Sequence, residues 1–163
     1  MRVPTHAPSV AAMRIRHAHA AVGVAAGDGS AVSRGAFAAG TATVSMSAAG
    51  DSGTIAVGTG ANAGRIMVGV TACGAATLTT TDTVVVNGTT GAENITLDLS
   101  GGQFAPGVAV EGSGTSEIEF VIDLSTGVQD RVTLTGSVLA DTVTLGGSGV
   151  NLNSDDDVDV TLT

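Results

Sequence analysis

The sequence is poor in the residues on which most enzyme mechanisms and most large hydrophobic cores depend. Its 163 residues include no lysine, tryptophan or tyrosine, one cysteine, three phenylalanines and three histidines, and all three histidines precede residue 20. Downstream of residue 39, general acid–base chemistry by histidine or lysine is therefore excluded, and so are a Ser-His-Asp triad and a P-loop. The single cysteine, Cys73, forms no internal disulfide. These absences predict a protein that is not an enzyme.

Glycine is abundant instead, with 24 residues in the chain. From residue 41 onward, short runs rich in β-branched residues alternate with glycine-rich turns, which is typical of short strands. We expect strands at residues 43–47, 54–57, 65–70, 76–79, 83–86, 94–99, 118–124, 131–134, 142–145 and 158–162. The predicted fold is all-β, a parallel β-solenoid whose stacked coils bury rows of Val, Ile and Leu.

Positive charge is scarce beyond residue 40. There, fourteen acidic residues face only Arg65 and Arg131, whereas the first forty residues carry four arginines and one aspartate. An acidic surface repels nucleic-acid phosphates and attracts cations. We therefore expect no nucleic-acid partner, and metal ions become the favoured ligands.

The basic, alanine-rich N-terminal part has the composition of an export signal. Residues 13–16 would be its n-region, residues 20–26 its apolar h-region, and residues 36–38 a small-x-small cleavage site. The alternative is a disordered leader without a function. No stretch reaches the ~18 uninterrupted apolar residues of a membrane span. The prediction is a leader at residues 1–39, a β-repeat domain at residues 40–163, and an extracellular location, either secreted or at the cell surface.

Two sixteen-residue phrases indicate an internal repeat. The first, DTVVVNGTTGAENITL, begins at Asp82, and the second, DRVTLTGSVLADTVTL, begins forty-eight positions later at Asp130. Each phrase carries a second acid eleven residues after the first, Glu93 in one copy and Asp141 in the other. Each acid lies before an expected strand, where a turn carboxylate and glycine carbonyls can together face calcium, an ion that takes six to eight oxygen ligands.

The tail holds the densest set of candidate ligands. Oxygen-bearing side chains stand at every second position, at Asn151, Asn153, Asp155, Asp157 and Asp159. If the segment is extended, they share one face of a strand, where three carboxylates would repel one another without a cation. The alternative is a solvated acidic turn before the last strand. The candidate metal ligands of the whole chain are Glu93, Asp141, Asn151, Asp155 and Asp157, with Asp82 and Asp130 as secondary choices.

Two of these segments resemble a known repeat. The segments 88–95 (GTTGAENI) and 146–151 (GGSGVN) are similar to the nonapeptide G-G-x-G-x-[DN]-x-U-x of the RTX, or haemolysin-type, calcium-binding repeats, with Thr89 in place of a glycine and Glu93 in place of an aspartate. The resemblance implies a parallel β-roll or β-helix, calcium bound between the turns of successive coils, and secretion.

The sequence leaves three functions open. The leading hypothesis is a secreted, non-catalytic calcium-binding repeat protein in which calcium stabilises a β-solenoid. The second is a calcium-independent structural or adhesive segment at the cell surface, whose acidic residues keep it soluble. The third is a detached repeat segment of a larger secreted enzyme. We also expect further repeats or a protein partner at the C-terminal edge of the solenoid.

Overall fold

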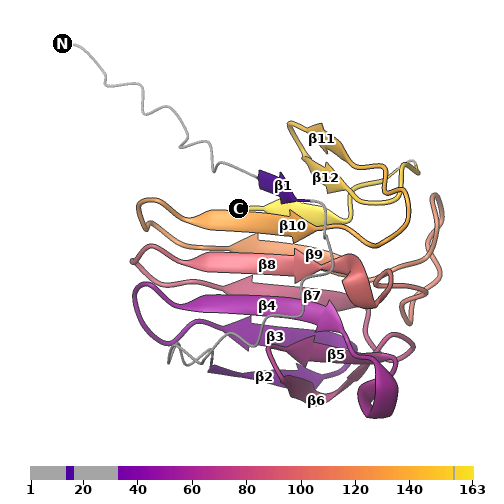
Figure 1. Ribbon diagram of the computed structural model, residues 1–163, viewed down its shortest axis with the longest axis horizontal. Coiled ribbons are helices and arrows are strands. Elements are labelled where there is room, and N and C mark those ends of the chain that lie inside the picture. The colour runs from indigo at the N-terminus through magenta and orange to yellow at the C-terminus, as the bar shows by residue number, and fades with distance from the viewer. Residues whose placement is uncertain (1–13, 17–32, 156) are drawn as a thin grey trace.

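The chain forms a β-solenoid of about three turns, as a computed structural model of residues 14–16, 33–155 and 157–163 shows. Each coil contributes one short strand to each of two sheets, so that the strands stack in two layers (Figure 1). The coils are formed by β3 (Thr41–Ser45) and β4 (Ser52–Val57), by β7 (Thr83–Asn87) and β8 (Asn94–Asp98), and by β9 (Glu119–Asp123) and β10 (Arg131–Thr135). The prediction of an all-β parallel solenoid is confirmed.

Successive coils stack in parallel and in register. In one sheet, β3 pairs with β7 and β7 with β9, and in the other, β4 pairs with β8 and β8 with β10. Residues 41–57 therefore belong to the same solenoid as the later repeats. Two three-residue strands continue the stack, because β13 (Val160–Leu162) adds in parallel to β9 and β1 (Arg14–Arg16) adds in parallel to β10.

Antiparallel strands cover the opposite end of the stack. Strand β2 (Ser33–Ala38) pairs with β3, and the hairpin of β5 (Arg65–Val68) and β6 (Thr71–Thr77) pairs with β4. The domain boundary expected at residue 40 thus falls between β2 and β3, and the expected cleavage sequence lies within β2. Apart from residues 14–16, the expected h-region and n-region lie outside the described residues. Within the described part of the chain, no helix is long and apolar enough to cross a membrane.

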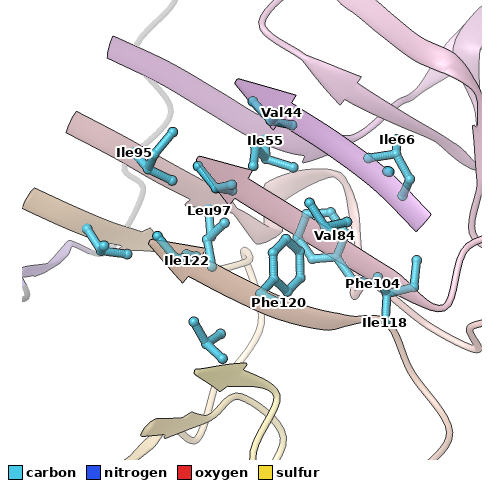
Figure 2. Close-up of a cluster of buried hydrophobic side chains, with 14 of the residues drawn as sticks. Val44, Ile55, Ile66, Val84, Ile95, Leu97, Phe104, Ile118, Phe120 and Ile122 are labelled. Carbon is cyan, nitrogen blue, oxygen red and sulfur yellow. The ribbon is translucent and has the colours of Figure 1, made fainter. Parts of the chain in front are cut away.

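The core fills the space between the two sheets. Burial alternates along the strands, and the inward positions carry Val, Ile and Leu, such as Val44, Ile55, Val84, Ile95 and Leu97 (Figure 2). Full burial of each such side chain stabilises the fold by ~1.5–3 kcal/mol. The rings of Phe104 and Phe120 meet edge to face, with centroids 4.8 Å apart. Rows of aliphatic side chains thus form a core without any tryptophan or tyrosine.

The structural repeat differs in register from the repeat seen in the sequence. Stacking places Thr83 beside Glu119 and Asn94 beside Arg131. The forty-eight-residue alignment matches β7 with β10 instead, although these strands lie in different sheets. The two phrases look alike because each contains a strand, a turn with glycine and an acid, and the local sequence preferences of these features are the same in both sheets.

The two sides of each coil differ in the length of their connections. Short turns at residues 46–51, 88–93 and 124–130 lead from the β3 sheet to the β4 sheet. These turns stack closely, since a Cβ atom at Gly127 would overlap the carbonyl oxygen of Gly91. Long segments at residues 58–82, 99–118 and 136–159 lead back. They hold the β5–β6 hairpin, the 3-10 turns η1 (Gly60–Asn62) and η2 (Leu99–Gly101), and the antiparallel hairpin of β11 (Thr144–Gly146) and β12 (Gly149–Asn151).

Candidate metal centre

Four carboxylates from two distant segments meet beside the start of β9 and β13. Glu117 belongs to the segment before β9, and Asp155, Asp157 and Asp159 belong to the loop between β12 and β13. One oxygen of each residue lies within 4.8 Å of an oxygen of every other. Ligands on opposite sides of a calcium ion are about 5 Å apart, since each Ca–O bond measures about 2.3–2.6 Å. A single ion can therefore contact all four residues.

The loop between β12 and β13 folds back on itself around Asn151. The Asn151 Nδ2 donates to the backbone oxygens of Asp155 and Asp157, at 2.8 Å in both cases, and its Oδ1 accepts from the Ser154 N–H at 2.5 Å. Ser154 has a φ of 67°, in the left-handed region. The alternating residues of the tail are therefore arranged around a loop and do not share a strand face. Asn151 shapes this loop with its whole amide group.

The segment before β9 docks directly onto this loop. The Asn153 Nδ2 donates to both carboxylate oxygens of Glu117 at 2.8 Å, and the Thr115 N–H donates to Asp155 Oδ2 at 2.6 Å. The Glu117 N–H donates to Glu111 Oε1 at 3.0 Å, which brings a fifth carboxylate to the group. Polar contacts between residues almost forty positions apart thus hold the two segments together.

Several carboxylate oxygens of this group are buried without a partner. Asp159 is 1% exposed; its Oδ2 accepts from the Leu152 N–H at 2.5 Å, whereas its Oδ1 has no hydrogen-bond partner. The same is true of Asp157 Oδ1 and Glu111 Oε2. Each buried acceptor without a donor costs about 1–3 kcal/mol. A bound cation could satisfy the unpartnered oxygens of Asp157 and Asp159, which belong to the four-carboxylate group.

The arginines beyond residue 40 lie elsewhere. Arg65 Nη2 donates to the Gly74 backbone oxygen at 2.9 Å, and Arg131 begins β10 in the other sheet. The carboxylates therefore shift one another's pKa values. Burial raises the pKa of Glu117 to about 9, and the nearby charge of Asp159 acts in the same direction. Burial also raises the pKa of Asp159.

The pKa values of Asp155 and Asp157 are shifted in opposite directions. The neighbouring Asp155 carboxyl raises the pKa of Asp157 to about 7, whereas the hydrogen bond from the Thr115 N–H lowers the pKa of Asp155 to about 2. A divalent ion would favour the charged form of every carboxylate and release the bound protons. The ion has an access route, because Asp155 and Asp157 also line an open cleft of about 370 Å³ beside the β11–β12 hairpin.

The remaining ligands predicted from the sequence lie away from this cluster. Asp82 directly precedes β7, whereas Glu93 ends the turn that follows β7, so the length of a five-residue strand lies between them. Asp130 and Asp141 likewise lie on either side of β10. The two acids of each sixteen-residue phrase thus do not face one ion. Glu93 is fully buried and accepts a hydrogen bond from the Thr89 hydroxyl, while its N–H donates to Asp130 Oδ1 at 3.0 Å.

These acids close turns. Asp141 Oδ2 accepts from the Ser137 N–H at 2.9 Å, and Asp51 Oδ2 accepts from the N–H groups of Ser47 and Ala48 at 2.7 and 2.9 Å. In each case, as with Glu93, the partner is a serine or threonine four residues before the acid. The pattern S/T-x-x-x-D/E therefore marks a turn-closing acid in this fold.

The structure thus brings together only part of the predicted ligand set. Of the seven residues, Asp155 and Asp157 belong to the cluster and Asn151 shapes its loop. Glu117 and Glu111 were not predicted, and Asp159 belonged to the alternating tail set but not to the final seven. Asp159 has a sequence signal, because it directly precedes a strand, as Asp82 does. The two strands belong to the same sheet. Asp156 lies outside the described residues. Comparisons of the chain with protein-family models, with curated proteins and with solved structures give no match.

Proposed function

We propose that this chain is a secreted, non-catalytic calcium-binding repeat protein in which one Ca²⁺ ion stabilises the solenoid. The proposed ligands are Glu117, Asp155, Asp157 and Asp159, with Glu111 beside them. The observation that carries the proposal is Asp159, which is 1% exposed and has one carboxylate oxygen without a partner inside a group of four carboxylates. An ion at this point would neutralise the group and satisfy the orphaned oxygens.

Calcium fits this group better than other common metals. All ligands are oxygens, which favours hard cations over zinc or copper. Magnesium demands a near-ideal octahedron with bonds of about 2.0–2.1 Å and usually keeps several water molecules. A crowded, partly buried set of carboxylates on two loops suits the larger ion, whose coordination is more flexible.

Secretion is the second part of the proposal. The basic, alanine-rich N-terminal sequence and the resemblance to RTX repeats support it. A site with a dissociation constant of about 10⁻⁴–10⁻³ M, typical of extracellular modules, would be filled outside the cell and empty in the cytosol. Folding would then be completed after export.

Isothermal titration calorimetry of the full chain, with calcium added to chelator-treated protein, tests the proposal. We expect one calcium per chain, weaker binding of magnesium, and loss of the binding heat in an Asp155→Asn/Asp159→Asn double variant. Asp98→Asn is the matched control, because the Asp98 carboxylate accepts a hydrogen bond from the Ser100 N–H, far from the cluster in sequence. No calcium heat in the unaltered chain would reject the proposal and favour a calcium-independent structural or adhesive segment.

A further inference from the structure

We propose that calcium controls whether β13 covers the edge of β9, so that the ion opens and closes one end of the solenoid. This inference rests on the proposed function of the same site. It adds that the effect of calcium is local, confined to residues 111–123 and 144–163, while the first two coils fold without the ion.

The candidate ligands are built into the pairing of β9 with β13. The Phe120 N–H donates to the Asp159 backbone oxygen at 2.7 Å, directly before Val160 pairs with Phe120. Glu117 lies two residues before β9 on the facing segment. The crowded carboxyl groups of Glu117 and Asp159 therefore flank the first bond of this short ladder, and without an ion they must either repel each other or take up protons, both at a cost to the folded state.

Apart from the polar contacts of the loop before it, little holds the last strand in place. The ladder comprises only three residue pairs, and it ends with a bond of 3.1 Å from the Thr163 N–H to the Ile122 oxygen. Among the described residues from 144 onward, only Val150, Leu152 and Val160 join the buried core, and all three residues of β11 are exposed. A small apolar contact thus opposes the cost of crowding several carboxyl groups, two of them buried, without an ion.

The rest of the solenoid does not depend on this site. Strands β3, β4, β7 and β8 each pair over several residues and bury alternate aliphatic side chains. Their turns are closed by Asp51 and Glu93, each of which has a carboxylate oxygen that accepts a hydrogen bond from a residue of the same turn. Removal of the ion should therefore release the last strand and leave these coils folded.

Hydrogen exchange of the full chain, measured by mass spectrometry at neutral pH with excess calcium or with chelator at equal ionic strength, tests the inference. With calcium at 100 times its dissociation constant, linkage predicts exchange that is up to about 100-fold slower in residues 119–123 and 149–163 than in chelator. Residues 41–57 and 83–98 should exchange at the same rate in both conditions.

A Glu117→Gln/Asp159→Asn double variant removes two calcium ligands and, with them, two of the crowded acidic groups. The last strand of this variant should therefore stay protected with or without calcium. The control variant Asp98→Asn should behave like the unaltered chain. Chelation that leaves all exchange rates unchanged, or that speeds exchange in every strand, would overturn the inference. If calorimetry still shows calcium binding in that case, the proposed function stands, whereas absence of calcium heat would reject the proposed function itself.

Discussion

Glu117→Gln should stabilise the protein in chelator and destabilise it in calcium. The pKa of the Glu117 carboxyl is about 9 in the folded protein against 4.5 for an ordinary glutamate. At pH 7 the folded chain therefore keeps a proton that the unfolded chain releases. Each pH unit between 4.5 and 7 then removes about 1.4 kcal/mol of stability, or about 3 kcal/mol in all. Glutamine carries no ionisable proton and avoids this loss.

The expected net gain is smaller, because the substitution also removes a hydrogen bond. Asn153 Nδ2 donates to both oxygens of Glu117, and glutamine offers one acceptor in place of two. With about 1 kcal/mol for that bond, the variant should be about 2 kcal/mol more stable than the unaltered chain in chelator. In calcium the order should reverse, because the unaltered chain gains ~2.7 kcal/mol at 100 times the dissociation constant and the variant has lost a ligand.

Urea unfolding at pH 7, followed by circular dichroism in chelator and in calcium, measures both effects. The gain in chelator corresponds to a rise in Tm of about 4–8 °C for a chain of this size. Asp98→Asn, outside the cluster, serves as the control. It should neither raise the stability in chelator nor lower it in calcium. A glutamine variant that is less stable than the unaltered chain in chelator would refute the reasoning, since the Glu117 carboxyl would then stabilise the fold without any ion.

Three further predictions concern pH, the turns and the stacked glycines. In chelator, stability measured by urea unfolding should fall as pH rises from 4.5 toward 9, because the raised pKa of Glu117 means that the folded state binds an extra proton. Excess calcium should flatten this slope, and a stability that rises with pH would contradict the raised pKa of Glu117. Asp51→Asn should lower stability by about 1.5–3 kcal/mol, equally with and without calcium, because it weakens two charge-assisted bonds within one turn; a loss seen only in calcium would make Asp51 a ligand. Gly127→Ala should lower the Tm in both conditions, because its Cβ would overlap the Gly91 oxygen, and an unchanged Tm would show that the turns are not in close contact.

The strands of the coils could be predicted from sequence because their composition carries the signal. Runs such as Thr83–Asn87 and Glu119–Asp123 alternate buried and exposed β-branched or aromatic residues, and the structure places strands there. Strand β2 was missed because Ser33–Ala38 is rich in alanine and glycine, which are depleted in strands. Strand β6 runs over Thr71–Thr77, earlier than expected, since it is held by pairing with β5 and not by its own propensity.

The metal centre could be predicted only in part, because its geometry depends on tertiary contacts. Asp155 and Asp157 stood out as part of a dense acidic run within one segment. Glu117 did not, because it reaches the same point from another coil, and only the stacking of β9 on β13 brings it there. Conversely, Glu93 has the sequence context of a ligand, but one of its oxygens accepts from Thr89 within its own turn, the other is buried without a partner, and the four-carboxylate group does not include it. Local sequence patterns therefore identify candidate acidic ligands, but they do not show which of these acids meet at one site.

The unequal sides of the coil have a consequence for how such a chain can diversify. On the side of the short turns, each turn lies against the next, so that an inserted residue would push neighbouring coils apart. On the side of the long returns, the chain already accommodates a hairpin, a 3-10 turn and an acidic loop without disturbing the register of the strands. New peptide can thus be acquired, or grafted by design, in the long returns away from the carboxylate cluster, while the opposite side stays fixed in length.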